Sequence, residues 1–394
     1  MSKYHFQTEI IKPKTVSAAI HNSLQNEALR TRKPRVLTVG MHLTKTRGGI
    51  TTLIAEILNS SLKDDFEFAY IESQAEDFGK FGKAFLALQA IARFVWSCIW
   101  KRPELVYVHL GSNASLYRES IFILLAKLFG QTVVTHFHAG DIDNYYPFQS
   151  KIGQSFIRWA INCSDLVIAV SQESAKQLRN ITDSLKISVI PNAIDTSVFN
   201  AGKQLTDKPS DGAVRLLFVG AVGKLKGERD LIKALAILRE SGNTNIKVSF
   251  LGYGAESLKD YCEETGTIDF VEHLGAVSMS ERIGFYQKAD IFVLPTYAEA
   301  MPMSVIEAMA AGLAIISTPV GGIPELIEGG VDGFLFPPGD VNALAEKISY
   351  LLNNKDLTIK IGGRARKKAS EQLNFPRYAG KLRQCLLAAC KLKT

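Results

Sequence analysis

The stretch IFVLPTYAEAMPMSVIEAMAAGLAIIST, residues 291–318, has the pattern of a strand, a helix and a second strand. Its two ends, IFVLP and AIIST, are short apolar runs containing the β-branched residues that favour buried strands. Buried strands that are joined by helices lie parallel to one another in a sheet. The stretch therefore predicts a βαβ unit, and with it an α/β fold.

The same alternation of apolar runs and helical segments extends over most of the chain. Further strands are expected at 35–40, 105–110, 131–137, 165–170, 186–190, 214–220, 246–252 and 333–337. The polar segment 200–212 interrupts the pattern and is the expected linker. We predict two doubly wound, Rossmann-like domains that face each other across a cleft, at 1–205 and 206–374, with a last helix at 375–394 packing back on the first.

Composition narrows the class of protein. The chain has 394 residues, of which 46% are hydrophobic, and a net charge of +7, which suits a phosphorylated substrate or an anionic membrane surface. Its 5 cysteines are scattered without a C-x-x-C pair, which indicates a reducing compartment without disulfides or a zinc site. The N-terminal segment is too polar for a signal peptide, and we expect no apolar run of about 18 residues that could span a bilayer. These features favour a cytoplasmic protein.

Two loops after predicted strands suit phosphate binding. Gly48 and Gly49 lead into a helix, whose N-terminus offers free N–H groups to an anion. The second loop carries glycines and lysines ahead of a helix: Gly220, Gly223, Lys224, Lys226 and Gly227. Flexible turns with solvated lysines would have the same composition, so both readings stay open. The segment around Gly252 gives only a broken dinucleotide-binding pattern, because Ser257 stands where the third glycine belongs.

Two acidic residues interrupt an apolar run. Glu299 lies in the loop after the predicted strand at 291–295, and Glu307 lies inside the helix that follows. A buried carboxylate is costly without a partner, and the run itself contains no lysine or arginine. We expect the helix N-terminus to stabilise both charges, which could then accept hydrogen bonds from sugar or ribose hydroxyls. A solvated helix face is the alternative for either residue alone.

Two histidines end the predicted strand at 131–137. His136 and His138 share one face of an extended strand, and imidazole can donate hydrogen bonds into a cleft. Either could equally be a structural histidine that is satisfied locally. The neighbouring aspartates show no spacing that is diagnostic of a metal site.

At this point the residues resemble a known family, the retaining GT-B glycosyltransferases of family 4, also called glycosyl transferases group 1. The stretch from Glu299 to Glu307 resembles the family's E-x7-E motif. Its flanks, PTYAEAMPMSVIEAMAAGLAIISTPVGGIPELIEGGVDGFLFPPGD at 295–340, match the family's central block, and IPNAIDTSVF at 190–199 matches its interdomain signature. The resemblance is strong in the second half of the chain and looser in the first, where it points to polysaccharide-assembly members.

The resemblance implies a role for each matching residue. Glu299 would bind hydroxyls of the donor sugar, Glu307 the ribose diol, and Lys226 the diphosphate. His138 would contact the donor sugar near the reacting carbon, and Gly49 the phosphates. The donor site as a whole would comprise Gly48, Gly49, Gly220, Lys224, Lys226, Gly252, Glu299, Ala300, Met301, Pro302, Met303 and Glu307. The loop with Ile323, Pro324 and Glu325 would lie beside the nucleotide.

The sequence departs from the family at one position. Ala221 stands where the family usually has an arginine that pairs with the diphosphate, so Lys224, Arg229 or the loop backbone would have to replace it. On the acceptor side, the resemblance suggests Ser115 and Arg118, one turn apart at a helix start, together with His136. An ordinary exposed arginine is the equal alternative for Arg118.

The expected reaction is transfer of a sugar from a UDP- or GDP-sugar to an acceptor hydroxyl, with retained configuration and without a metal or other cofactor. The acceptor would be a glycan or a lipid-linked glycan in surface-polysaccharide synthesis, and no nucleic acid is expected. Three alternatives remain: a sugar-nucleotide epimerase on the same scaffold, an NAD-dependent enzyme, which the broken glycine pattern disfavours, and a non-catalytic sugar-nucleotide-binding protein.

A helix expected at 81–102 suggests where the enzyme works. Trp96 and Trp100 lie four residues apart on one face, and the basic residues around them are Lys83, Arg93, Lys101 and Arg102. Tryptophan flanked by positive charge is typical of an interfacial helix. Together with the basic residues of 30–47, it predicts peripheral docking on an anionic membrane. The alternative is a buried helix that packs its tryptophans on the sheet.

Overall fold

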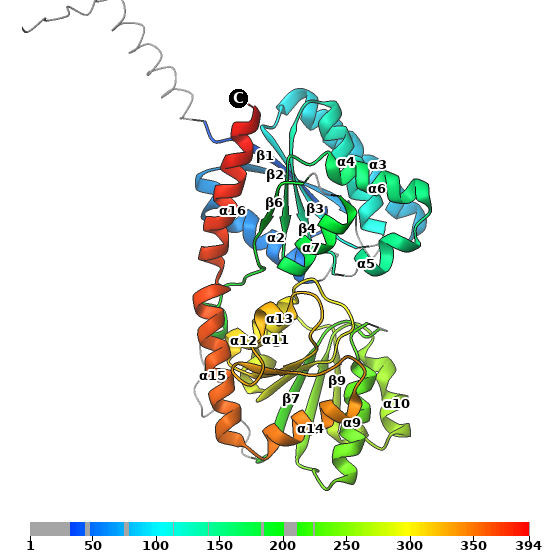
Figure 1. The fold of residues 1–394 in the computed structure, drawn as a ribbon, viewed down its shortest axis with the longest axis vertical. Coiled ribbons are helices and arrows are strands. Elements are labelled where there is room, and N and C mark those ends of the chain that lie inside the picture. Colours follow the sequence, from blue (N-terminus) through cyan, green and yellow to red (C-terminus); the bar gives the residue numbers. More distant parts are fainter. Residues whose placement is uncertain are drawn as a thin grey trace, which may run out of the picture.

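The computed structural model describes residues 32–43, 48–74, 79–112, 114–140, 142–182, 185–200, 211–223 and 225–393. Two domains, each built on a six-stranded sheet, are stacked along the long axis of the molecule (Figure 1). All neighbouring strands in both sheets are parallel. This arrangement confirms the predicted α/β fold with two Rossmann-like domains.

The first sheet has the order β2-β1-β3-β4-β5-β6. Its strands are β1 (Arg35–Met41), β2 (Glu67–Gln74), β3 (Leu105–Leu110), β4 (Thr132–Phe137), β5 (Leu166–Ala169) and β6 (Ile187–Val189). The helices of this domain are α2 (Gly49–Asn59), α3 (Lys80–Trp96), α4 (Ala114–Leu128), α5 (Ile142–Tyr145), α6 (Lys151–Asn162) and α7 (Gln172–Ile181). A π-helical turn, η2 (Ser97–Lys101), continues α3.

The second sheet has the order β12-β11-β10-β7-β8-β9. Its strands are β7 (Val214–Val219), β8 (Ile246–Leu251), β9 (Val271–Gly275), β10 (Ile291–Leu294), β11 (Ala314–Ser317) and β12 (Gly333–Leu335). The accompanying helices are α8 (Ser197–Asn200), α9 (Glu228–Glu240), α10 (Lys259–Glu264), α11 (Met279–Lys288), α12 (Met303–Ala311), α13 (Ile323–Leu326), α14 (Val341–Leu352) and α15 (Lys355–Gln372). The central strands are buried from end to end, which is why they read as continuous apolar runs.

Two strands were not predicted, and both lie at the edge of a sheet. In β2, with the sequence EFAYIESQ, and in β9, with the sequence VEHLG, polar residues shorten the apolar runs. Few residues of either strand are buried, so neither shows the long apolar run by which the central strands were recognised.

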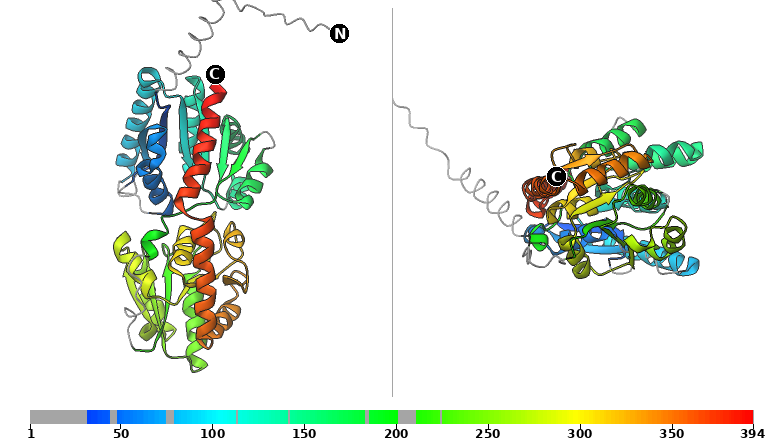
Figure 2. Two further views of the ribbon diagram at one scale, coloured as in Figure 1. Left: turned by 90° about the vertical axis from the view of Figure 1, so that its left-hand side faces the viewer. Right: turned by 90° about the horizontal axis from the view of Figure 1, so that it is seen from below.

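The chain crosses between the domains twice. It first passes through residues 190–196, and it returns through α15 and α16 (Phe375–Cys390), which run along one side of the molecule (Figure 2). The backbone of Ile194 is bonded to both neighbours of Asn374: its N–H donates to Leu373 at 3.1 Å, and Phe375 N–H donates to its carbonyl at 2.9 Å. The apolar side of α16 packs in the core of the first domain against β3, β4 and α2. The two crossings are thus hydrogen-bonded to each other at the junction.

The segment Phe81–Lys101, formed by α3 and η2, is long and apolar enough to cross a membrane by length and composition. The sequence analysis expected no such segment. Its inner face, with Ala90, Phe94 and Cys98, is buried against the first sheet. Such packing is typical of a surface helix of a folded domain.

Candidate functional site

The loop between β10 and α12 holds Glu299 at the junction of the domains. It is clamped between two glycines, one from each domain. A Cβ atom on Gly140 would lie 2.2 Å from the backbone nitrogen of Ala300, and one on Gly321, where φ is +53°, would lie 1.5 Å from the carbonyl oxygen of Glu299. Any side chain at either position would push the loop away, so these glycines determine where Glu299 can stand.

Lys226 is the partner of Glu299. Its Nζ donates a hydrogen bond to Oε1 of the glutamate, and both side chains keep some exposure to solvent. The two residues that were expected to bind the diphosphate and the donor sugar are therefore in contact. Lys224, the second lysine of this loop, lies outside the described residues. Arg229 places its guanidinium over the ring of Tyr261, and Ala221 is exposed.

Glu307 is buried in α12 and has two partners on α11. Arg282 contacts Oε1 at 3.0 Å, and the Tyr286 hydroxyl donates to Oε2 at 2.8 Å. Burial raises the pKa of Glu307, while Arg282 and Tyr286 act in the opposite direction. The expectation that the helix N-terminus alone would stabilise the two carboxylates is therefore wrong, because each has a charged partner from a distant segment. Arg282 and Tyr286 are four residues apart, so they lie on one face of α11. This spacing does not identify Glu307 as their partner.

The N-termini of α2 and α9 differ in their suitability for phosphate. At α2, the N-cap residue Gly48 carries no side chain, Gly49 lies against Met303 of α12, and the first turn has no acidic residue. At α9, the first turn contains Glu228 and Asp230, and Glu228 accepts a hydrogen bond from Gly223 N–H at 3.2 Å. Acidic groups already fill the positive end of α9. Of these two helices, α2 is the better anion site.

The remaining donor-side residues form the frame of this region. Gly220 N–H donates to Leu251 O at 2.9 Å beside Gly252, where β7 and β8 end side by side. Met301, Pro302 and Met303 are buried at the start of α12, and the amide of Asn192 donates to Met301 O at 2.9 Å. Glu325 accepts the backbone N–H of Gln172 at 2.8 Å across the junction. The contacts of Asn192 and Glu325 hold the two domains together, and the Gly220 contact joins neighbouring strands of the second domain.

The first domain contributes a buried cluster of histidines. His138 hydrogen-bonds through Nε2 to Nδ1 of His109 at 3.1 Å, and Nδ1 of His136 lies 2.7 Å from the Tyr107 hydroxyl. Burial lowers the pKa of His138 to about 3 and those of His109 and His136 well below the ordinary value, so all three rings are neutral near pH 7. His109 was not predicted, although its position opposite His136 on the neighbouring strand brings the rings together.

The structure corrects the expectation for His136. Its side chain is 0% exposed, and its ring stacks on Tyr378 of α16 in the domain core. A residue sealed under the C-terminal helix has no surface for an acceptor. One ligand atom from each of His109, His136 and His138 lies within 4.8 Å of the others, a cluster that the sequence spacing did not suggest.

Ser115 and Arg118 support a buried carboxylate. Ser115 Oγ donates to Glu119 at 2.8 Å and accepts Gly111 N–H at 2.9 Å. Arg118 Nε donates to the same carboxylate at 2.9 Å, and the arginine side chain is 20% exposed. Ser115 thus has a local structural partner, and only Arg118 retains a surface that could meet an acceptor.

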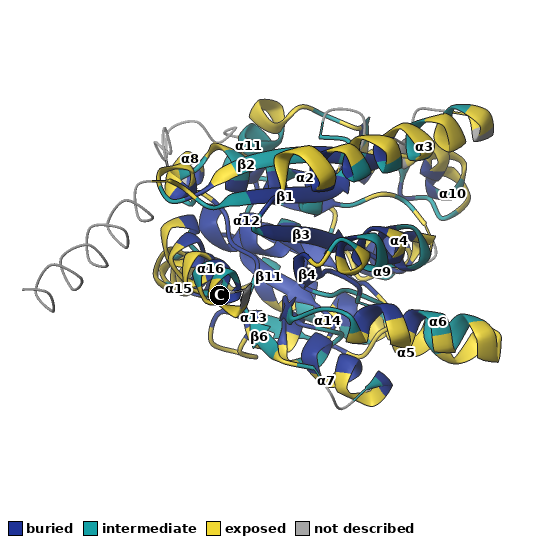
Figure 3. Ribbon diagram, turned by 90° about the horizontal axis from the view of Figure 1, so that it is seen from above, coloured by how far each residue is buried: buried dark blue, intermediate teal, exposed yellow. Residues whose placement is uncertain are grey.

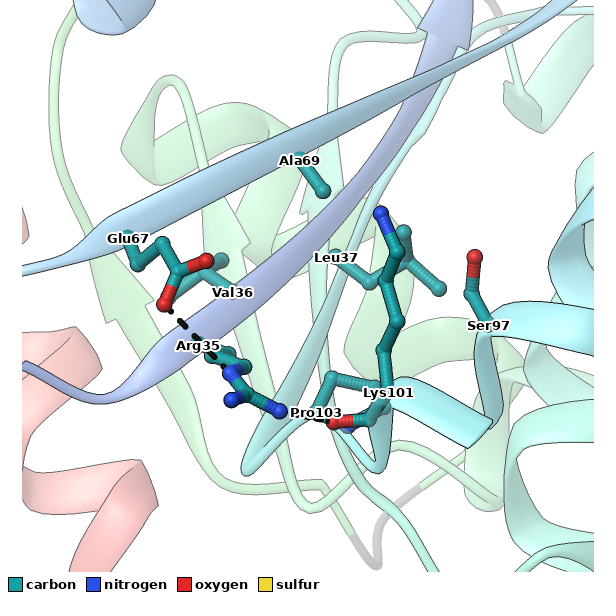
Figure 4. A pocket seen from close by; sticks show the side chains of 8 residues that line it. All are labelled: Arg35, Val36, Leu37, Glu67, Ala69, Ser97, Lys101 and Pro103. Carbon is teal, nitrogen blue, oxygen red and sulfur yellow. Dashed lines mark hydrogen bonds and ion pairs between the residues drawn. The ribbon is translucent and has the colours of Figure 1, made fainter. Parts of the chain in front are cut away.

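A shallow pocket lies elsewhere in the first domain (Figure 4). Arg35, Glu67 and Pro103, which line it, stand at the amino ends of β1, β2 and β3, and Lys101 of η2 extends along it. The carboxyl ends of the same strands face the junction, so this pocket is separate from the region around Glu299. Its nearest helical neighbour is the apolar segment α3–η2.

Comparison with known proteins identifies the class. Residues 206–368 match the family described as Glycosyl transferases group 1, and residues 56–198 match Glycosyltransferase Family 4. The chain is similar to the sulfoquinovosyl transferase of Arabidopsis thaliana, with 26% identity over 75% of this chain and 57% of that protein. It is also similar to the amylovoran biosynthesis glycosyltransferase of Erwinia amylovora, with 28% identity over 70% of this chain and 68% of that protein.

The fold agrees with a solved structure of the same architecture. The Anabaena protein HepE, in a complex with UDP-glucose, superimposes with a TM-score of 0.71 at 19% identity, covering 90% of this chain and 100% of that one. The protein has the GT-B fold. Its second half matches the glycosyl transferases group 1 and its first half Glycosyltransferase Family 4, and the chain belongs to the glycosyltransferases. The named relatives transfer sugars, so the epimerase alternative is not favoured.

Proposed function

We propose that this enzyme transfers a sugar from UDP- or GDP-sugar to a hydroxyl of a lipid-linked glycan, with retention of the anomeric configuration, during surface-polysaccharide synthesis. The observation that carries the proposal is the contact between Lys226 and Glu299 on a loop that both domains clamp. It joins a cation for the diphosphate to a carboxylate for the sugar.

The chemistry needs groups that favour the departing nucleoside diphosphate. The bond between the sugar's anomeric carbon and the phosphate oxygen breaks while a bond to the acceptor oxygen forms on the same face. The leaving phosphate takes the acceptor's proton. Lys226 and the N-terminus of α2 stabilise the negative charge that develops on the phosphate. These groups supply the positive potential without a metal ion.

Glu307 is the proposed ribose ligand, and its two partners affect the ionisation of its carboxyl group. Without a nucleotide, the carboxylate oxygens are held by Arg282 and Tyr286. A ribose diol that donates two hydrogen bonds to Glu307 has to share the carboxylate with them. Burial raises the pKa of Glu307 and Arg282 opposes that effect, so Arg282 favours the ionised carboxylate, which is the stronger acceptor for the diol.

Membrane docking through α3 and η2 gains support from the position of the tryptophans. Trp96 is 53% exposed and Trp100 73% exposed, so the alternative in which they pack on the sheet is wrong. The outer face also carries Phe81, Phe85, Leu88 and Ile99. Lys83, Arg93, Lys101 and Arg102 are exposed beside them, and Lys101 Nζ lies 5.4 Å from the Trp96 ring centre.

The helix α6 extends this exposed apolar surface. It is linked to α3 through α4, which contacts both helices, and all three helices project from the same side of the first domain (Figure 3). Phe148 precedes α6, and Ile152 and Trp159 lie on it, all exposed together with Lys151 and Arg158. Two tryptophan-bearing helices with flanking basic residues fit an anionic bilayer interface.

Co-sedimentation with liposomes tests the docking. We expect the protein to pellet with vesicles containing anionic lipid at low salt and to be released as salt rises, because charge attraction adds about 1 kcal/mol per well-placed Lys or Arg. The double variant Trp96→Ala/Trp100→Ala should stay in the supernatant with an unchanged melting temperature. Ile359→Ala, which removes an exposed apolar side chain of the second domain, is the control. If the double variant and the control bind the vesicles equally well, α3 is not part of the docking surface.

A thermal-shift screen of UDP-, GDP- and ADP-sugars tests the donor. A ligand at 100 times its dissociation constant adds about 2.7 kcal/mol of stability, which is readily detected. Transfer of label from the best donor to a lipid-extractable acceptor then distinguishes a transferase from a binding protein.

A further inference from the structure

His109 and His138 share a hydrogen bond between their ring nitrogens. Resting on the function proposed above, we propose that His109 is a positioning residue that fixes the tautomer of His138, so that His138 presents an N–H group from Nδ1 to the donor sugar. The geometry begins with the 3.1 Å contact between Nδ1 of His109 and Nε2 of His138. The two rings are nearly parallel, with planes 14° apart.

Neutral imidazole has one N–H donor and one bare acceptor nitrogen. Because burial lowers the pKa of both rings, each is neutral at physiological pH, and the shared hydrogen bond must use one donor and one acceptor. Two arrangements satisfy this rule. Either His109 donates from Nδ1 and His138 carries its proton on Nδ1, or His138 donates from Nε2 and His109 carries its proton on Nε2.

The outer nitrogens decide between these arrangements. Nε2 of His109 and Nδ1 of His138 are both shielded from solvent and have no hydrogen-bond partner within the described residues. A buried N–H without a partner is rarer than an under-used acceptor. The second arrangement would leave such an N–H on His109, within the domain. The first leaves it on His138, directly after β4 and beside the segment at Gly140 that touches the Glu299 loop.

A bound donor would then complete the network. An N–H on Nδ1 of His138 can donate to a sugar oxygen, and the ring cannot act as a general acid while its pKa is near 3. His109 therefore acts through His138, in the way that a hydrogen bond to one ring nitrogen sets the role of the other. The class of ligand this favours is a sugar with an acceptor oxygen at that position.

Three substitutions of His109 separate positioning from packing. His109→Asn places an amide N–H where Nδ1 stands, whereas the longer His109→Gln reaches the Nε2 position. His109→Phe keeps a ring and removes the hydrogen bond. His136→Phe is the matched control, since His136 is also fully buried but is bonded to Tyr107.

We expect His109→Gln and His109→Phe to lower kcat about tenfold, the usual effect of one hydrogen bond, with little change in donor KM. His109→Asn and His136→Phe should stay within about threefold of wild type. Equal losses in the Asn and Gln variants would overturn the proposal, as would a wild-type kcat for His109→Gln. The Asn and Gln pair remains decisive if the Phe variant does not fold.

Nitrogen-15 NMR of histidine-labelled enzyme reads the tautomer without any assay. Wild-type His138 should show a proton on Nδ1 and a bare Nε2, and the His109→Gln variant should show a mixture. A wild-type proton on Nε2 contradicts the proposal even if the enzyme is active. A stoichiometric transition metal in the purified protein also overturns it, because three neighbouring imidazoles would then be ligands. A failure of the proposed transfer reaction would instead appear as inactivity of the wild type with an intact tautomer signature.

Discussion

The two sides of the domain junction differ in how they are charged. The second domain presents ion pairs, Lys226 with Glu299 and Arg282 with Glu307. The first domain presents neutral imidazoles, His109 and His138, which burial keeps unprotonated. Ionised groups suit the diphosphate and the ribose, whereas neutral hydrogen-bonding groups suit a sugar that is about to carry positive charge. The difference suggests that the nucleotide is bound by one domain and that the sugar is oriented between both.

The largest effect is expected from the cation of the charged side. Lys226→Ala should lower kcat/KM by about 10²–10³-fold, because a preorganised group that stabilises the leaving diphosphate is lost. Steady-state kinetics with the best donor measure this. Lys233→Ala removes an exposed lysine from α9 and should be silent. Near-normal turnover in Lys226→Ala would show that Lys226 does not stabilise the diphosphate.

The two glutamates sharpen the comparison within the charged side. Glu307→Gln should weaken binding of the free nucleoside diphosphate by about 1.5–3 kcal/mol, since a charged hydrogen bond to ribose is lost. Glu299→Gln should mainly lower turnover with the intact donor. Calorimetric titration of the nucleoside diphosphate into both variants separates these effects. The same loss of nucleotide affinity in both would refute the division of roles.

The main residues of the charged side were predicted from sequence, whereas on the neutral side only His138 was. Glu299 and Glu307 fall in a motif with fixed spacing, and Lys226 lies in a loop of glycines and lysines ahead of a helix, so all three were recognised before the fold was known. Their partners were not, because Arg282 comes from another helix and its pairing depends on how α11 packs on α12. His109 lies in an apolar strand and gains its role only from the register of β3 against β4.

The strands show the same division between local and tertiary information. Buried central strands such as β10 were predicted from apolar runs, whereas the edge strands β2 and β9 were missed because their exposed residues break the pattern. The return of the last helix to the first domain was predicted, but the burial of His136 under it was not, because tertiary packing decides which strand residues α16 covers.

The neutral side can be tested through the pH dependence of stability. Burial lowers the pKa of His136 well below 6.5, so below about pH 6.5 the unfolded chain takes up a proton that the folded protein does not. His136 therefore destabilises the wild type as pH falls. His136→Phe has no imidazole to protonate at this position. The free energy of unfolding of the variant, relative to that of the wild type, should therefore rise by about 1.4 kcal/mol for each pH unit below 6.5. Urea unfolding at pH 5, 6 and 7.5 measures the difference, and a constant offset would mean that the ring is charged when folded.

The smallest effect is expected from metal removal. The proposed site neutralises the diphosphate with Lys226 and the α2 N-terminus, so prior incubation with EDTA should leave the initial rate unchanged. The rate is measured with and without added Mg²⁺ or Mn²⁺. Activity that is lost with EDTA and restored by either ion would show that these groups are not sufficient.

The stereochemistry of the product tests the central claim most directly. The proposed same-face displacement keeps the leaving diphosphate and the incoming hydroxyl on one side of the sugar. Proton NMR of the product formed from an α-linked nucleotide sugar reports its anomeric configuration. The account predicts an α-glycoside formed together with one equivalent of nucleoside diphosphate. A β-glycoside would contradict it, because it would require attack from the opposite face.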